Sequence, residues 1–191
     1  MSKIAEEMFA LQLGKRYKIP TVAMRYSIVQ GSRQSFYNAY SGACRIFSLA
    51  FHQGKEPQIY EDGNQVRDFV NIHDVVDANL LVLEDERADY EMFNVGGGAP
   101  VTVNQFASAC AKIYGIKNYQ PKPSGKYRFG DTRHIWSDTS KLESLGWKPS
   151  RTIYDSILEY KEWLDCASSI DNIIEYCSKK MEELNVLRDV S

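Results

Sequence analysis

The sequence lacks a long uncharged apolar run, so we expect neither a membrane-spanning helix nor a membrane partner. It also lacks a cluster of basic residues, and with a net charge of −2 we expect no nucleic-acid partner. C-x-x-C pairs are absent among its four cysteines, and its three histidines are dispersed along the chain. We therefore expect no metal site, and reduced, mostly buried thiols in a cytoplasmic protein.

What is present is typical of a folded domain. The 191 residues are 43% hydrophobic and 25% charged, which suits one core, or one core with an appendage. Apolar residues predict a helix over Ser2–Arg16, and a short, nearly all-apolar strand follows at Pro20–Tyr26. A helix, a short loop and an apolar strand make half of a parallel α/β unit.

A turn, a strand and a helix follow one another between residues 60 and 83. Asp62-Gly63 predicts the turn, because glycine accepts positive φ and aspartate can bond its own backbone. Val66–Ile72 is rich in β-forming residues and predicts the strand. Asp74 stands where the N-cap of a helix is expected, ahead of an apolar series.

Arg67 stands where this strand leaves the turn, a place from which a side chain can reach a ligand. The planar fork of donors on a guanidinium matches the oxygens of a diphosphate. On these residues alone, however, a surface Arg67 paired with Asp68 or Glu61 is the better interpretation.

Three glycines, Gly96–Gly98, follow a strand predicted at Glu91–Val95. They match neither the GxGxxG nor the GK[ST] pattern, so we interpret them as a tight strand-to-helix connection rather than a phosphate loop. Thr102 and Gln105 form a capping box at the head of the next helix. The other predictions are an aperiodic loop at Ser27–Tyr40, a basic loop at Tyr119–Asp131, strands at Pro57–Tyr60 and His134–Asp138, and helices at Ser41–Gln53, Ser140–Leu145, Thr152–Leu164 and Ala167–Leu187.

Six groups of residues, each weak alone, stand in a recognisable order along residues 1–165. They are Arg25–Gly31, Asp62–Phe69 with His73–Val76, Phe93–Gly98, Arg128–Asp131, Ser137–Lys141 and Leu145–Pro149. In this order they resemble the C-terminal part of the extended short-chain dehydrogenase/reductases, the UDP-glucose 4-epimerase-like, NAD-dependent sugar-nucleotide epimerases and dehydratases. Because of this resemblance, we expect Arg67 to bind a ligand rather than to form a surface ion pair with Asp68 or Glu61.

The resemblance implies a cofactor site that is incomplete. The family binds NAD through a strand, a GxxGxxG loop and a helix, and no such motif occurs here. Lys3 and its neighbours are similar to the end of the catalytic Tyr-x-x-x-Lys motif, which makes Lys3 the expected catalytic and cofactor-binding lysine and puts the tyrosine before Met1. Arg25 and Tyr26 lie where the family chain crosses from cofactor to substrate, and are further cofactor-binding candidates. We expect NAD in the full-length family and none bound by this chain alone.

The substrate side is better represented. By the resemblance, Arg67 and Arg128 would contact the diphosphate of a nucleotide sugar and Asp131 its nucleoside ribose. Gln58 and Tyr60 would lie on the strand that borders the base. The implied partner is therefore a nucleotide-diphosphate sugar.

The sequence also departs from the family pattern. Ile28 stands where the family often has an asparagine, and Phe129 where proline is usual. Ala43 or Cys44 falls where many epimerases place a substrate-binding asparagine. These departures leave the identity of the sugar nucleotide open, and the tail after Cys166 is longer than the family leads us to expect.

The expected fold is α/β, the C-terminal portion of a Rossmann-type parallel sheet plus a small mixed α+β substrate-binding lobe. Residues 1–31 and 66–90 would form the remnant of the Rossmann-type layer, 32–65 and 91–165 the nucleotide-sugar-binding lobe, and 166–191 a C-terminal helical extension. We expect the substrate-binding portion of an epimerase or dehydratase, inactive alone. One alternative is a non-catalytic module that forms a homodimer or complements an N-terminal half; another is a truncated product without a function of its own.

Overall fold

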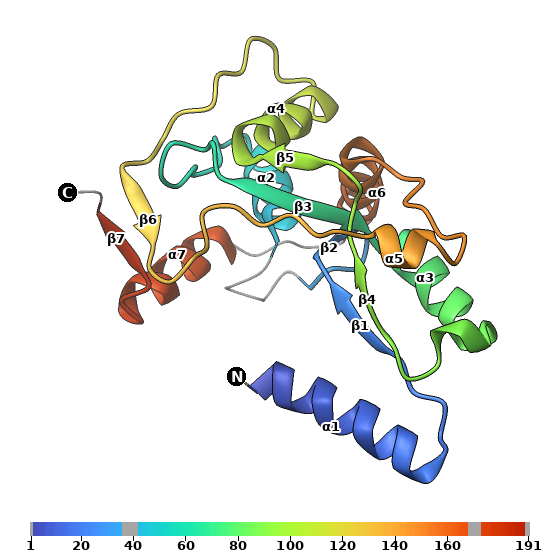
Figure 1. Ribbon diagram of the computed structural model, residues 1–191. Helices are drawn as coiled ribbons and strands as arrows, with labels where there is room; N and C mark the ends of the chain where they lie inside the picture. Colours follow the sequence, from blue (N-terminus) through green and yellow to red (C-terminus); the bar gives the residue numbers. More distant parts are fainter. Residues whose placement is uncertain (1, 36–41, 168–172, 190–191) are drawn as a thin grey trace.

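The computed structural model describes residues 2–35, 42–167 and 173–189 (Figure 1). The predicted loop and helix residues at 36–41 and the predicted helical residues at 168–172 lie outside this description. The α-helices are α1 (Ser2–Tyr17), α2 (Ala43–His52), α3 (Ile72–Glu84), α4 (Val103–Ile113), α5 (Ser140–Glu143), α6 (Ile153–Asp165) and α7 (Ile173–Glu183), and a 3-10 helix covers Glu86–Ala88. The strands are β1 (Ala23–Tyr26), β2 (Ile28–Gln30), β3 (Val66–Asn71), β4 (Met92–Val95), β5 (Pro100–Thr102), β6 (Lys126–Arg128) and β7 (Leu187–Asp189).

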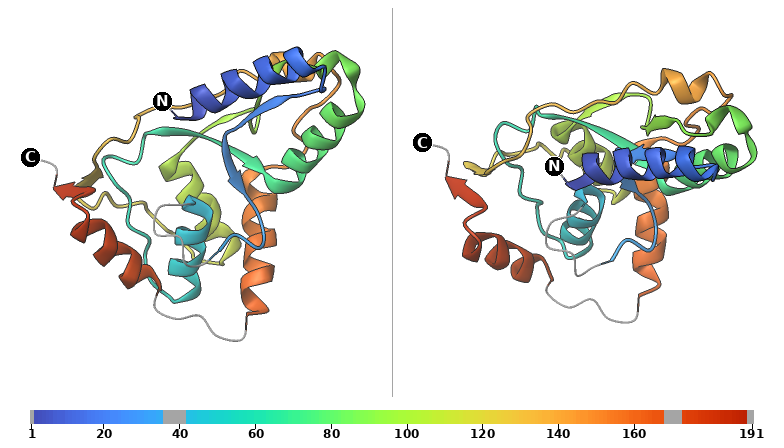
Figure 2. Two further views of the ribbon diagram at one scale, coloured as in Figure 1. Left: turned by 90° about the horizontal axis from the view of Figure 1, so that it is seen from below. Right: turned by 60° about the horizontal axis from the view of Figure 1, so that its bottom comes forward.

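Two parallel strand pairs stand at the centre of the fold. β1 lies parallel to β4, and β2 lies parallel to β3, to which β5 adds an antiparallel neighbour. Only Ser27 separates β1 from β2, so one stretch of chain supplies a strand to each pair. Figures 1 and 2 show α1 at the edge of the molecule, beyond β1. The parallel strands and their helices confirm the predicted α/β class.

Two predicted strands are wrong. Pro57–Tyr60 makes a single isolated bridge, at Ile59. His134–Asp138 is not a strand, although the Ile135 N–H donates to the Val66 carbonyl at 3.1 Å beside β3. In both cases one or two backbone hydrogen bonds hold an extended segment against a neighbour, and no ladder forms.

Four observed strands, β2, β5, β6 and β7, were not predicted. Each has three residues, which is too short to show the alternation by which a strand is recognised. The helix predicted to reach Leu187 is also shorter, because α7 ends at Glu183 and β7 follows. Asn185 lies beyond that end with φ of 54°, the left-handed conformation common after helices.

The N-terminus of α3 differs from its prediction. Asn71, not Asp74, is the N-cap, and its side-chain oxygen accepts the His73 N–H at 2.8 Å. Asp74 is buried and accepts from the Ser150 hydroxyl at 2.9 Å and the Arg151 N–H at 3.0 Å. A side chain held by distant donors cannot cap its own helix, and local spacing could not reveal those donors.

The capping box of α4 is confirmed. The Thr102 hydroxyl accepts the Gln105 N–H at 3.1 Å, and the Gln105 side chain accepts the Thr102 N–H at 2.8 Å. Such boxes depend on residues three apart, so the sequence alone identifies them.

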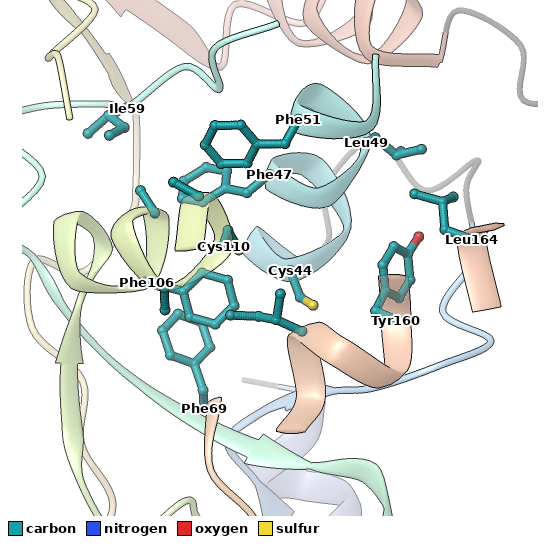
Figure 3. Packing of buried hydrophobic residues seen from close by; sticks show 14 residues of the cluster. Cys44, Phe47, Leu49, Phe51, Ile59, Phe69, Phe106, Cys110, Tyr160 and Leu164 are labelled. Carbon is teal, nitrogen blue, oxygen red and sulfur yellow. The ribbon is translucent and has the colours of Figure 1, made fainter. Parts of the chain in front are cut away.

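The larger hydrophobic cluster lies between α2, α4 and α6 (Figure 3). The Phe69 ring of β3 packs against Phe106 of α4 at 4.4 Å between centroids. Cys44 and Cys110 are free and buried in this cluster, as predicted, whereas Cys166 is free and exposed. A second cluster packs α3 and Trp147 against β3 and β4. Within the described ranges, no helix combines the length and apolar character needed to cross a membrane.

Asp68 of β3 is a buried carboxylate that joins three segments. Its Oδ2 accepts the Ser27 hydroxyl at 2.7 Å and the Ser137 N–H at 3.2 Å, and its Oδ1 accepts the Gly97 N–H at 2.7 Å. A Cβ at Gly97 would lie 1.7 Å from the Phe69 carbonyl oxygen, so only glycine allows this approach. The glycines after β4 therefore serve close packing on β3 and lead into β5.

Replacing Asp68 tests this junction. Asp68→Ala would leave three donors without their acceptor, so we expect the free energy of unfolding to fall by about 2 to 5 kcal/mol. Urea unfolding followed by circular dichroism measures the change. Glu84→Ala, which removes an exposed carboxylate at the end of α3, is the control and should change little. Equal unfolding midpoints for the two variants would rule out a structural role for the Asp68 carboxylate.

Candidate functional site

A cavity of about 610 Å³ lies where α2, β3, β6 and α7 meet the segment 55–61. Its walls include all five predicted substrate-binding residues, namely Gln58, Tyr60, Arg67, Arg128 and Asp131. These residues come from separate parts of the chain, and the fold brings them to one place. A cavity of this size is typical of small-molecule sites.

Two arginines converge on one carboxylate in this cavity. Arg67 Nη2 and Arg128 Nη1 each lie 3.8 Å from Asp131 Oδ2. Arg67 Nη1 also donates to the carbonyls of Val66 at 2.9 Å and Arg133 at 2.8 Å, which restrains the guanidinium. Two positive charges face one negative charge, so the group retains an excess positive charge that suits an anionic ligand.

Arg133 holds the loop after β6 against the turn before β3. Its Nη1 lies 2.7 Å from Glu61 Oε2 and its Nη2 lies 2.7 Å from Asp62 Oδ2. Hydrogen bonds from Arg133 and from the Asn64 backbone lower the pKa of Asp62 to about 2. The same loop contacts the start of β3, where the Val66 N–H donates to His134 Nδ1 at 3.2 Å. Arg67 therefore pairs with neither Glu61 nor Asp68, because both carboxylates have other partners.

Tyr60 and Gln58 lie on the side of the cavity formed by segment 55–61. Burial raises the pKa of the Tyr60 phenol, and the positive charges of Arg128 and Lys126 partly offset this. The Tyr60 carbonyl accepts from Gln65 Nε2 at 3.0 Å, which closes the turn between them. Tyr60 is thus a neutral hydroxyl that can donate to a ligand, and Gln58 is an exposed amide beside it.

Another part of the cavity wall is apolar, and two of the family departures lie there. Ile28 of β2 and Ala43 of α2 both line the cavity, beside Phe47 and Phe69. Cys44, the other candidate for the second departure, is buried in the core, and burial raises the pKa of its thiol to about 12. Of the three residues named for these two departures, the two that line the cavity, Ile28 and Ala43, have hydrocarbon side chains.

The three predicted cofactor residues do not line this cavity. Lys3 of α1 is 88% exposed and pairs with Glu6 at 2.5 Å. Arg25 Nε and Nη2 each donate to Glu7 at 2.6 Å, and the Tyr26 hydroxyl donates to an amide of α3 at 2.8 Å. Across the described residues, no three His, Cys, Asp or Glu side chains gather as a metal site would require.

A Tyr-x-x-x-Lys spacing does occur on α7, at Tyr176 and Lys180. Tyr176 is 57% exposed, and Lys180 Nζ lies 3.3 Å from Glu183. Neither residue lines the cavity. The spacing at this position therefore identifies no catalytic pair.

Sequence reasoning missed several residues of the site. Arg133 lies between the predicted basic loop at Tyr119–Asp131 and the segment predicted as a strand at His134–Asp138, and no local sign shows that it bridges Glu61 and Asp62. Ser178 and Met181 of α7 line the cavity from a helix that was interpreted as an extension. Their spacing of three residues predicts that they share one face of the helix. The sequence does not show which surface that face contacts.

A model of the family described as "NAD dependent epimerase/dehydratase family" matches residues 1–96 of this chain. The dTDP-L-rhamnose 4-epimerase of Burkholderia thailandensis is 35% identical over 164 residues, which are 85% of this chain and 45% of that protein. The chain therefore spans about half the length of this curated relative.

Solved structures give the same match. The UDP-glucose 4-epimerase of Thermotoga maritima, solved with UDP-glucose, has a TM-score of 0.76 and 34% identity, and the match covers 85% of this chain and 51% of the epimerase. The dTDP-glucose 4,6-dehydratase of Bacillus anthracis, solved with NAD, has a TM-score of 0.70 over 83% of this chain and 49% of the dehydratase. At 22% identity the second likeness shows the fold alone.

The Arg133 bridge can be tested through the titration of Asp62. Its pairing lowers the pKa from 3.8 to about 2, so the stabilisation is present above pH 3.8 and is lost as the pH falls through about 2. In Arg133→Ala we expect the Asp62 midpoint to rise towards 3.8, as followed by carboxyl NMR. Arg151→Ala, which breaks a separate pair with Asp74, should leave it unchanged. An unchanged midpoint in Arg133→Ala would contradict the bridge.

Proposed function

This chain belongs to the NAD dependent epimerase/dehydratase family, and we propose that it is the part of such an enzyme that binds the nucleotide sugar. The observation that carries the proposal is the convergence of Arg67 and Arg128 on Asp131 in a cavity of about 610 Å³. A diphosphate offers oxygens to both guanidinium groups and compensates their excess positive charge.

The proposed roles follow from chemistry at each position. Arg67 and Arg128 bind the diphosphate. Asp131, as an acceptor, takes hydrogen bonds from ribose hydroxyls once the diphosphate has drawn the arginines away from it. Tyr60 and Gln58 supply a hydroxyl and an amide to the nucleoside. UDP-glucose and dTDP-sugars are the first ligands to test, because proteins similar to this chain are named for them.

We further propose that these 191 residues bind without turnover. Lys3, Arg25 and Tyr26 are each engaged with a neighbouring side chain and do not line the cavity, so they do not fit a dinucleotide site by themselves. No Gly-rich phosphate loop of the NAD-binding type occurs in the printed sequence. We accordingly assign no proton or hydride transfer to any residue of this chain.

Arg67→Ala tests the binding role. We expect its affinity for UDP-glucose or dTDP-glucose to fall about 10- to 100-fold, because one charge-assisted hydrogen-bonding group is lost. Isothermal titration calorimetry measures the affinity. Arg87→Ala, which removes an exposed arginine from an ion pair with Asp85, makes the same charge change and should bind like the wild type.

The wild-type chain and NAD, assayed with the same sugar nucleotides, should give no epimer and no dehydrated product. Measurable turnover would contradict the proposed inactivity but not the binding role. Equal affinities of Arg67→Ala and the wild type would remove Arg67 from the site.

A second function, assembly with another chain, is favoured by one specific observation. α1 exposes several large apolar side chains, among them Ile4, Met8, Phe9 and Leu13. Large apolar side chains exposed together on one helix tend to pair with another surface. The chain would then form a homodimer, or would complement the half of the family fold that it does not match.

Phe9→Asp tests the assembly function, since Phe9 is 68% exposed on α1. If α1 mediates self-association, light scattering should show a dimer for the wild type and a monomer for Phe9→Asp, because a carboxylate would be desolvated at the interface. Ala10→Asp is the control, because it adds the same carboxylate at an exposed position of α1 about 100° round the helix from Phe9, and it should remain dimeric. A monomeric wild type at high concentration would exclude the homodimer.

A further inference from the structure

The C-terminal segment Ile173–Asp189 forms one wall of the cavity. Ile174, Ser178 and Met181 of α7 line it. Their spacing of four and three residues puts them on one face of the helix. The neighbouring residue Lys179 is exposed and does not line the cavity.

The same segment is fixed to the strand that carries Arg128. β7 pairs with β6 in antiparallel register, with Leu187 opposite Arg128. The Phe129 N–H donates to the Val186 carbonyl at 2.8 Å, a bond that a proline at position 129 could not make. In Figure 1, β7 and β6 lie side by side with α7 next to them.

Side chains reinforce this attachment. The Arg188 guanidinium lies 3.8 Å from the centre of the Phe129 ring, a cation–π contact. Lys126 Nζ of β6 lies 2.9 Å from Glu182 Oε1 of α7. The Lys126–Glu182 ion pair holds the first residue of β6 to α7, and the Arg188–Phe129 contact holds β7 to the residue that follows β6. These contacts fix the position of α7 beside Arg128.

We propose that this segment is a binding element of the site, and that Ile174, Ser178 and Met181 form the surface on which the nucleobase lies. The proposal rests on the proposed nucleotide-sugar function and adds to it the residues that contact the base. Once the diphosphate is placed at the arginines, the base and the sugar remain to be accommodated. A sugar ring needs partners for several hydroxyls, whereas two apolar side chains and one hydroxyl suit the face of an aromatic base. The Met181 thioether adds a favourable contact with an aromatic ring.

Ser178→Trp is the direct test, because it puts a large side chain into the cavity from this wall. We expect the affinity for UDP, dTDP or GDP, whichever the wild type binds most tightly, to fall roughly tenfold or more. Lys179→Trp adds the same bulk on the exposed side and should bind within about twofold of the wild type. Met181→Ala, which removes contacts without adding bulk, should weaken binding several-fold and serves if Ser178→Trp fails to fold. Circular dichroism and urea unfolding check the fold of each variant.

Comparing the nucleoside diphosphate with its sugar derivative identifies the part of the ligand on this wall. Contact with the base predicts that Ser178→Trp weakens UDP and UDP-glucose by the same factor. Weaker UDP-glucose with unchanged UDP would put the sugar on the wall and overturn the assignment. If Arg67→Ala loses affinity while Ser178→Trp and Met181→Ala bind like the wild type, the wall proposal fails and the proposed function stands. A wild type that binds none of these nucleotides would overturn both.

Discussion

The buried carboxylate of Asp68 is the constraint on which the site depends. It accepts hydrogen bonds from Ser27 between the two parallel pairs, from Gly97 after β4, and from Ser137 after the β6 loop. Because successive side chains on a strand point to opposite faces, Arg67 faces away from Asp68 and towards the cavity. The Asp68 anchor on one face of β3 thus determines where the Arg67 side chain stands on the other face.

Charge pairing extends this arrangement across the cavity. Arg133 binds Glu61 and Asp62 with its side chain and accepts from Arg67 with its carbonyl. Asp131 lies between Arg67 and Arg128 at distances longer than a direct hydrogen bond, 3.8 Å to each. The carboxylate therefore moderates the repulsion of two guanidinium groups without saturating their donors. Such a group is prepared for an anion, because few bonds must be broken before the anion binds.

Sequence reasoning reached the fold class, the capping box of α4 and five residues that line one cavity. The capping box was predictable because its two partners are three residues apart. The five residues were reached through the order of family motifs, since nothing local to Arg67 favours a ligand over a surface ion pair. Reasoning failed where a distant partner decides, as at Asp74, whose carboxylate binds Ser150 and Arg151 instead of capping α3. The three-residue strands were also missed, because such short strands form only where a neighbouring strand is available for pairing.

By itself, the sequence determined most of the helices, the capping box of α4 and, through the order of its motifs, the family. Those properties depend on the residue types and on their order and spacing in the sequence. The tertiary structure decided that Arg67 and Arg128 share Asp131, that Arg133 joins the β6 loop to the turn, and that α7 forms a wall of the cavity. These contacts join segments far apart in sequence, and their geometry follows from how β3 packs against its neighbours. The physical reason is that a binding site requires fixed distances between groups, and only long-range packing fixes such distances.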